Sequence, residues 1–338
     1  MLNVPVMKKI SFLSKDDLHL FPKVLAQNIK DFYPPGSKIG IKVHFGEPGN
    51  LFAFTPAFIK QAVQSLQNVG LHPFLFDSPV SYDSPRNTVD GYYQVLKKKG
   101  ITPENMGCPV IISDEGITTS FANLEYSICK HLIDTDGVLV LTHVKGHTCT
   151  GFGGAIKNIG MGGMSKTTKR RIHDSGKPHY QKGCIGCKEC VVNCPLGNIK
   201  LKDNRPYFDQ NWCCGCSNCI YVCTSGCIVP QKEVFDQGLV AGAKLALDLY
   251  PPVFYVNVLM NIMRLCDCVS NPGPQLSRDI GIVFGEDIVA IEKASLDLIV
   301  KEMGEDVFLK EHKKSPLVHI KIAEDFGLGH LEYILKEH

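Results

Sequence analysis

The sequence predicts an α/β fold: a mostly parallel sheet with flanking helices, interrupted by an inserted cysteine-rich module. Two observations lead to this prediction. Strand-like and helix-like segments alternate with short joins on both sides of residues 179–231, and a strand–helix–strand order implies a parallel sheet. Within 179–231, cysteines recur at the spacing of metal ligands. We therefore expect an α/β domain in two parts, residues 1–178 and 232–338, around the insert.

Length and composition narrow the class of protein. The chain has 338 residues, 44% of them hydrophobic, which suits one large domain or two ordinary ones. A formal net charge of +2 argues against bulk binding to nucleic acid or to a membrane surface. Met1–Phe12 is too short an apolar run for a signal peptide, and Val253–Met263 is too short to span a bilayer. We expect a cytoplasmic protein, in a compartment that keeps thiols reduced.

The first part of the α/β domain shows clear periodicity. Short stretches rich in β-branched residues predict strands. Thr55 and Pro56 are typical of a helix N-cap and first turn, and Gly70 is typical of a helix end. The predicted strands are 38–45, 72–77, 109–113 and 137–143, and the predicted helices are 56–69, 90–99 and 123–133.

The second part continues the α/β pattern. A helical pattern covers 233–250 and ends at Pro251 and Pro252. Strands are then predicted at 254–258 and 279–284, and a helix at 287–303.

The insert contains two copies of one cysteine run, C-x2-C-x2-C-x3-C. This is the spacing of bacterial-type two-cluster ferredoxins, in which the fourth cysteine of each run binds the other cluster. The sequence therefore predicts an inserted bacterial-type two-cluster ferredoxin module with two 4Fe–4S clusters. The first thiol set is Cys184, Cys187, Cys190 and Cys223, and the second thiol set is Cys213, Cys216, Cys219 and Cys194.

A pair of zinc knuckles is the alternative, because C-x2-C pairs also bind zinc. The duplicated four-cysteine run, with Pro195 directly after the first copy, favours clusters. Thr224 stands where a second proline is usual, which removes a turn restraint but no ligand. Cys214 and Cys227 belong to neither set and are predicted to be dispensable for cluster binding.

Polar residues follow the predicted strand 137–143, where open α/β sheets bind ligands. His143, Lys145 and His147 alternate on one face of an extended segment and are candidate catalytic residues. A glycine-rich turn follows, and it fits neither the dinucleotide-binding fingerprint nor the P-loop. It is a candidate anion site, with a simple packing turn as the alternative. Its candidate binding residues are Gly151, Gly153, Gly154, Lys157 and Asn158.

Cys266 and Cys268 flank a single aspartate and form a candidate third site. In an extended segment both sulfur atoms would face one side. We expect them to approach His143, Lys145 and His147, with the thiolates binding a third metal or an organic cofactor. Two buried, inert thiols are the alternative.

These motifs together resemble the iron–sulfur proteins of the domain-of-unknown-function family numbered 362. The matching stretches are Ile41–Asn50, Thr55–Pro56, Pro73–Asp77, Lys145–His147, Gly151–Gly162, both cysteine runs, Cys266–Cys268 and Asp279–Ile282. The resemblance implies an α/β domain that carries two 4Fe–4S clusters, found mostly in anaerobes, with a distant likeness to the lactate-racemase fold. The missing second Cys-Pro and the segment Thr148–Thr150 depart from the family pattern.

The leading functional interpretation is an iron–sulfur redox protein, with oxidoreductase activity left open. Its clusters would relay single electrons between a redox partner, such as an acidic ferredoxin or a flavoprotein, and a substrate or cofactor site in the α/β domain. The basic run Lys166–Arg171 is a candidate docking surface for that partner, and a small anionic substrate is expected in the α/β site. Two alternatives remain: a pure electron-transfer or docking protein, and a non-redox metal enzyme distantly like lactate racemase with structural clusters.

Overall fold

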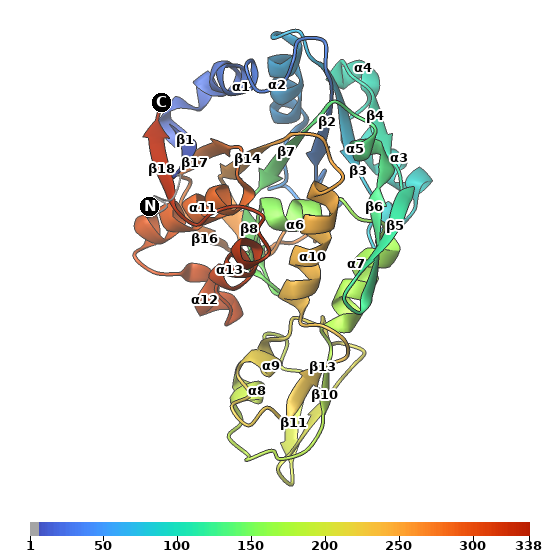
Figure 1. Cartoon of the computed structure of the whole chain (residues 1–338), viewed down its shortest axis with the longest axis vertical. Coiled ribbons are helices and arrows are strands. Elements are labelled where there is room, and N and C mark those ends of the chain that lie inside the picture. Colours follow the sequence, from blue (N-terminus) through green and yellow to red (C-terminus); the bar gives the residue numbers. More distant parts are fainter. Residues whose placement is uncertain (1–6) are drawn as a thin grey trace, which may run out of the picture.

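The computed structural model describes residues 7–338, so the first six residues of the amino-terminal run considered above lie outside it. Its centre is an eight-stranded sheet (Figure 1). In spatial order the strands are β18 (Tyr333–Glu337), β1 (Lys8–Ser14), β17 (Gly281–Gly285), β14 (Val253–Leu259), β7 (Gly137–His143), β2 (Lys38–Val43), β3 (His72–Asp77) and β4 (Val110–Ile112). Only β17 runs antiparallel to its neighbours within this described sheet, which confirms the mostly parallel arrangement.

Helices cover both faces of this sheet, because its central strands are apolar on both sides. In β7, Val138 and Val140 belong to one core layer, whereas Leu139 and Leu141 belong to the other. The first layer includes residues of α6 (Ala155–Gly160), α10 (Phe235–Leu247), α11 (Ile288–Met303) and α13 (Leu317–Asp325). The second includes residues of α1 (Phe21–Ile29), α2 (Pro56–Gln67), α3 (Val89–Lys98) and α4 (Pro103–Met106).

Most predicted elements lie within three residues of the observed ones, but the helix predicted at 123–133 is wrong. Those residues form β6 (Leu124–Cys129), which pairs with β5 (Gly116–Phe121), and a single helical turn, α5 (Lys130–Ile133). Leu124, Tyr126 and Ile128 alternate toward the core, as a half-buried strand requires. The edge strand β18, its neighbour β1 and the helices α1 and α13 were not predicted.

Residues 178–230 form a small lobe that projects from the α/β body (Figure 1). At its base, β10 (Pro178–Tyr180) pairs with β13 (Ile228–Pro230) and so brings the two ends of the segment together. The lobe also contains α8 (Glu189–Val192), the hairpin β11 (Ile199–Lys202) and β12 (Arg205–Phe208), and α9 (Asn218–Tyr221). Its own small core consists of Cys190, Ile199, Cys219, Cys227 and Ile228.

Within residues 7–338, no helix combines the length and the apolar character that crossing a bilayer requires.

Candidate functional site

The lobe groups its cysteines across the two runs. Burial raises the pKa of Cys190, and the other three thiols of the first thiol set raise it further because they crowd the same place. Burial likewise raises the pKa of Cys219, and the other three thiols of the second thiol set add to the effect. Each fourth cysteine, Cys223 or Cys194, therefore lies near the three cysteines of the other run.

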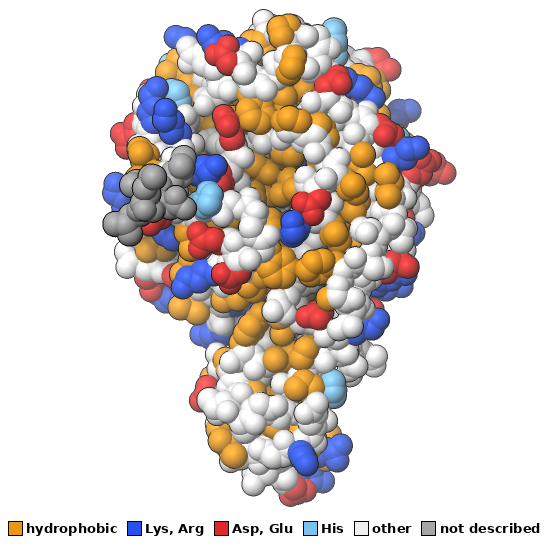
Figure 2. Space-filling view, in the orientation of Figure 1, with side chains coloured by type: hydrophobic (Ala, Val, Ile, Leu, Met, Phe, Trp, Pro, Cys, Tyr) orange, Lys and Arg blue, Asp and Glu red, His pale blue; other side chains and the backbone are white. Residues whose placement is uncertain are grey.

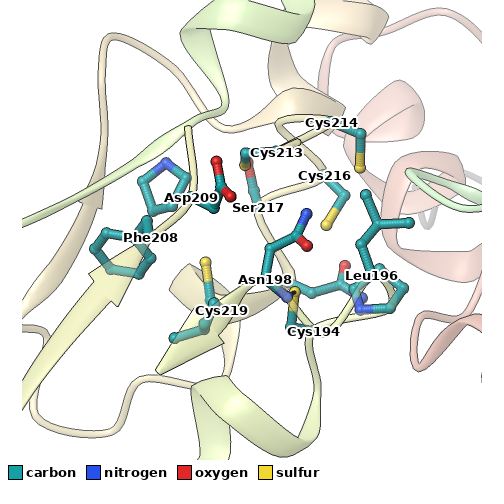
Figure 3. Close-up of a pocket in the computed structure, with 14 residues that line it drawn as sticks. Cys194, Leu196, Asn198, Phe208, Asp209, Cys213, Cys214, Cys216, Ser217 and Cys219 are labelled. Carbon is teal, nitrogen blue, oxygen red and sulfur yellow. Dashed lines mark hydrogen bonds between the residues drawn. The ribbon is translucent and has the colours of Figure 1, made fainter. Parts of the chain in front are cut away.

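The second thiol set lines a cavity in the lobe, together with Phe208 and Leu196 (Figure 3). Backbone amides point at two of its sulfur atoms: Asn198 N–H donates to Cys194 Sγ at 3.3 Å and Gly215 N–H donates to Cys213 Sγ at 3.4 Å. Gly215 has a φ of 69°, and a Cβ there would lie 1.9 Å from a carbonyl oxygen of the body, that of His173. Only glycine allows this loop to approach the body so closely.

Among residues 7–338, no three His, Cys, Asp or Glu side chains converge as ligands of a single ion would. A cubane cluster does not require such convergence, because each of its four thiolates binds a different iron at a different corner.

The α/β body has a cavity of about 390 Å³ at the carboxyl ends of β2, β3 and β7, where parallel sheets place their ligands. We call it the central cavity; its walls include His44, His147, Lys157, Cys266 and Cys268. Cys214 lines both the central cavity and the cavity of the second thiol set. The two cavities are therefore neighbours separated by one residue of the cysteine-rich loop.

Cys266 and Cys268 lie in a turn, not in the extended segment that was predicted. The turn is held by the buried Asp267, whose carboxylate lies 3.1 Å from His143 Nδ1 and 3.8 Å from Lys145 Nζ. Burial alone would raise the pKa of Asp267, but the nearby His143 and Lys145 lower it below its usual range. The negative charge of Asp267 thus stays in place and fixes the two flanking cysteines.

His143 and Lys145 both hold this turn, and His143 also lines the central cavity. His143 Nε2 donates to Met260 O at 2.8 Å, and its ring stacks on Phe54 with centroids 4.5 Å apart. Lys145 donates to the carbonyl oxygens of Phe52 and Asn261.

Cys268 is the thiol with the strongest cationic surroundings. Its Sγ lies 3.6 Å from His44 Nε2 and 3.9 Å from Lys157 Nζ. A hydrogen bond between the Cys266 and Cys268 side chains lowers the pKa of Cys268 and raises the pKa of Cys266, and Lys157 and His44 lower the pKa of Cys268 further. Of the two thiols, Cys268 is therefore the one that loses its proton more readily.

His147 is a neutral imidazole with one nitrogen free. Thr150 Oγ1 donates to Phe152 O at 2.6 Å, so it must accept from His147 Nδ1, which lies 2.8 Å away. Burial lowers the pKa of His147 well below its usual value, and Lys157 lowers it further. Nε2 therefore carries a lone pair that can accept a proton or bind a metal.

The glycine-rich turn brings Lys157 close rather than forming an anion cradle. The amino end of α6 already receives the buried Glu292 carboxylate, whose Oε1 accepts from Ile156 N–H at 3.4 Å. A Cβ at Gly154 would lie 2.0 Å from that carboxylate oxygen, and one at Gly153 would lie 2.7 Å from the Lys157 side chain. Gly151 turns with a φ of 78° against Lys314. Of the predicted anion-binding residues, Lys157 brings the positive charge.

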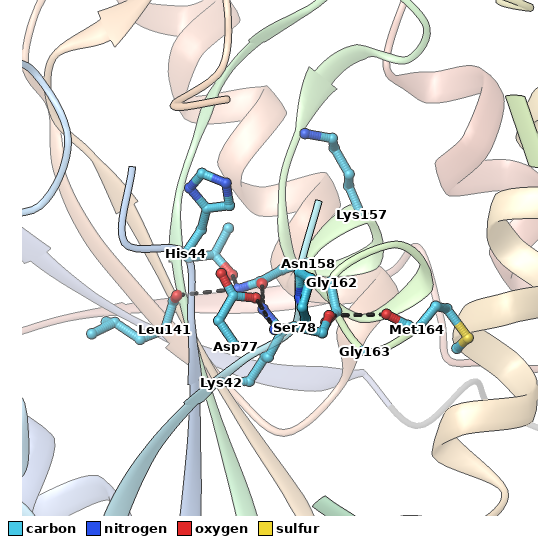
Figure 4. Close-up of polar contacts among 12 residues, drawn as sticks. Lys42, His44, Asp77, Ser78, Leu141, Lys157, Asn158, Gly162, Gly163 and Met164 are labelled. Carbon is cyan, nitrogen blue, oxygen red and sulfur yellow. Dashed lines mark hydrogen bonds and ion pairs between the residues drawn. The ribbon is translucent and has the colours of Figure 1, made fainter. Parts of the chain in front are cut away.

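A buried polar network lies beneath the central cavity (Figure 4). Lys42 Nζ donates to Asp77 Oδ1 and to Asn158 Oδ1, both at 2.9 Å, and Tyr92 Oη donates to Asp77 Oδ2 at 2.6 Å. Burial alone would raise the pKa of Asp77, but the nearby Lys42 and His44 lower it. Lys42 was not among the predicted site residues, although a lysine within the apolar run of β2 indicates a buried charge.

A second buried ion pair, which was not predicted from the sequence either, lies beside Cys268. Arg86 is fully buried, and its Nε donates to Glu47 Oε2 at 3.0 Å. Its Nη1 lies 3.1 Å from His44 Nε2, so its charge adds to the positive surroundings of Cys268.

The family model for DUF362, a domain of unknown function, matches residues 39–297. The chain belongs to the DUF362 family. Among solved structures, a Thermotoga maritima protein is 9% identical with a TM-score of 0.46, and the match covers 91% of this chain and 59% of that one. The lactate racemase apoprotein from Thermoanaerobacterium thermosaccharolyticum is 11% identical with a TM-score of 0.37, covering 74% and 50%. No curated protein matches this chain.

In this DUF362 protein the basic run Lys166–Arg171 begins α7 (Lys166–Ser175), and its charges contact the body. The buried Lys169 donates to Ser78 Oγ at 2.7 Å, and Arg170 donates to Ser81 O at 3.1 Å. Arg171 pairs with Glu125 at 2.6 Å. Lys169 and Arg170 therefore hold the segment after β3 against α7, and Arg171 joins α7 to β6.

One lysine joins the lobe of the DUF362 protein to its body. Lys314 Nζ, which is buried, donates to Cys149 O at 2.8 Å and to Cys216 O at 2.7 Å, and it pairs with Asp236 Oδ2 at 2.5 Å. His173 Nδ1 adds a contact of 2.8 Å to Cys214 O. The loop of the second thiol set is thereby fixed beside the central cavity.

Proposed function

We propose that this protein is a cytoplasmic iron–sulfur redox protein whose lobe holds two 4Fe–4S clusters. The clusters relay single electrons to or from the central cavity of the α/β body. The observation that carries the proposal is the position of Cys214, which lines both the cavity of the second thiol set and the central cavity. A protein that only carries electrons would need no more than the lobe. Because the second thiol set adjoins a cavity of the body, we infer that the electrons serve chemistry in that cavity.

The residues of the lobe fit the proposed clusters. The crossed grouping of the thiols is that of two-cluster ferredoxins, and the first thiol set would hold one cluster while the second would hold the other. The amide donors of Asn198 and Gly215 are suited to stabilise negative charge on sulfur. When bound, the clusters supply one-electron chemistry.

The lobe also offers a surface for a redox partner. Figure 2 shows hydrophobic side chains on it, and Ile185, Val192 and Trp212 are among its exposed hydrophobic residues. Lys182 and Lys188 add positive charge, because in the sequence they lie close to the cysteines of the first thiol set. Exposed apolar side chains together with basic residues on one small lobe suit brief contact with an acidic ferredoxin or flavoprotein.

The central cavity suits a small anionic substrate. Its volume lies within the range of small-molecule sites. Lys157 supplies positive charge, and the free Nε2 of His147 can take up a proton. We therefore assign substrate binding and proton transfer to these two residues.

Anaerobically purified protein tests the proposal. We expect about eight iron and eight sulfide per chain, the content of two cubanes. Cys194→Ser should remove the EPR signal of the cluster bound by the second thiol set, and Cys223→Ser that of the other cluster. Cys108→Ala, a buried cysteine of the body, is the matched control and should keep both signals. Stoichiometric zinc with no sulfide would contradict the proposal.

A further inference from the structure

We propose that Cys266 and Cys268 form a redox-active dithiol–disulfide pair that stores two electrons in the central cavity. The supply of those electrons rests on the proposed function, whereas the existence of the pair does not. Such a store would convert single-electron delivery by clusters into two-electron chemistry on a small anionic substrate.

The geometry of the turn permits the disulfide. Bridged cysteines have Cα atoms about 4.4–6.8 Å apart. Two residue rises of an extended strand span about 6.6 Å, close to the upper limit, and a turn shortens the separation. Val269 N–H donates to Cys266 O at 3.3 Å and closes this turn, and both cysteines line the central cavity.

The surroundings favour reactivity over inert burial. A thiolate is the nucleophile in disulfide exchange, and nearby cations stabilise it. Lys157 approaches the sulfur of Cys268, and Arg86 stands behind His44 on the same side, whereas Asp267 points the other way, toward His143 and Lys145. Both cysteines are half-buried in the wall of the cavity, so a small molecule can reach them.

Contacts and one shared cavity connect the second thiol set with the pair. Cys214 follows Cys213 directly in the chain, and Cys149 Sγ lies 3.7 Å from Cys214 O. Cys149 and Lys157 both line the central cavity, and Lys157 contacts Cys268. Lys314 holds the two cysteine-rich loops together by donating to Cys149 O and Cys216 O. The cluster of the second thiol set is therefore the electron donor to the pair.

The reaction balances with two electrons and one proton. The S–S bond between Cys266 and Cys268 breaks as each of two reduced clusters gives up one electron and returns to its oxidised form. Cys266 takes one proton and becomes a thiol, and Cys268 remains a thiolate beside Lys157. A low-potential one-electron donor then reduces the clusters again. When the pair transfers both electrons to a substrate, the S–S bond forms and Cys266 releases its proton.

Alkylation of the holoprotein tests the pair. Protein is equilibrated anaerobically in redox buffers of dithiothreitol, quenched with maleimide under denaturing conditions and digested. At low potential, the peptide that contains Cys266 and Cys268 should carry two maleimides. At high potential it should carry none, and its mass should be two hydrogens below that of the reduced, unlabelled peptide. Both thiols staying alkylated at every potential would overturn the proposal. So would a third metal that disappears in the double variant Cys266→Ser/Cys268→Ser.

Two variants separate the pair from its electron supply. Lys157→Met should make reduction by dithiothreitol about tenfold less favourable, since losing roughly one pKa unit of thiolate stabilisation changes the equilibrium tenfold. An unchanged equilibrium would contradict the role given to the cavity. In Cys194→Ser, dithiothreitol should still reduce the disulfide, whereas dithionite should reduce it more slowly than in the unaltered protein. Equal dithionite rates would leave the pair standing and refute the relay.

Discussion

Lys314→Met should loosen the lobe from the body. The substitution leaves Asp236 as a buried charge without its lysine and removes the donor from the carbonyl oxygens of Cys149 and Cys216. Removing one partner of a buried ion pair costs about 3–5 kcal/mol. Tyr221 Oη still donates to Asp236 at 3.0 Å, so we expect the middle of that range, about 4 kcal/mol.

The expected change in melting temperature follows from the size of the chain. At ~2.1 cal/mol/K per residue, 338 residues have an unfolding entropy of roughly 0.7 kcal/mol/K. A loss of about 4 kcal/mol then lowers Tm by about 6 °C. Thermal unfolding measures this shift, and limited proteolysis should cut the variant faster near residues 178 and 230, where the lobe joins the body.

Lys310→Met is the matched control, because Lys310 pairs with Glu305 at the surface. An exposed pair contributes about 0–1 kcal/mol, so Tm should hardly change. The double variant Asp236→Asn/Lys314→Met should lose less stability than the two single variants added together, because it leaves no buried charge. Additive losses, or a Lys314→Met variant as stable as the control, would refute this account of the junction.

Two further predictions concern the second thiol set and the pH dependence of stability. Gly215→Ala should lower the iron content of the protein, because its Cβ meets His173 O; Gly226→Ala, also at positive φ but with open space around it, should keep the full content. Burial lowers the pKa of Lys169 to about 8, whereas the unfolded chain keeps this proton up to a pKa of about 10.4. The unfolded state thus binds more protons between these values, and the free energy of unfolding gains up to about 3 kcal/mol as pH rises from 8 to 10.4. Urea unfolding of Lys169→Met should lack this contribution; an identical pH profile in both proteins would contradict it.

Local patterns were sufficient for much of the fold. The strands β3 and β7 were predicted with their observed bounds, because consecutive side chains of a buried strand are apolar on both faces. The helix predicted at 123–133 failed because a short amphipathic stretch can match either period, and pairing with β5 decides in favour of a strand. The two cysteine runs could be recognised because each run is local in the chain, whereas the binding of clusters by the crossed sets stays a prediction.

The sequence by itself determined which residues are candidates for chemistry: the two cysteine runs, the Cys266–Cys268 pair, and the histidines and lysines after β7. Only the tertiary structure decided what each of them does. Glu292, far along the chain, fills the turn predicted for an anion, and Asp267 takes His143 and Lys145 as its own charge partners at the wall of the cavity. Lys314 brings Cys149 and Cys216 together across the junction of lobe and body. Buried charges must find partners wherever the fold brings them, and those partners leave no periodic pattern in the chain.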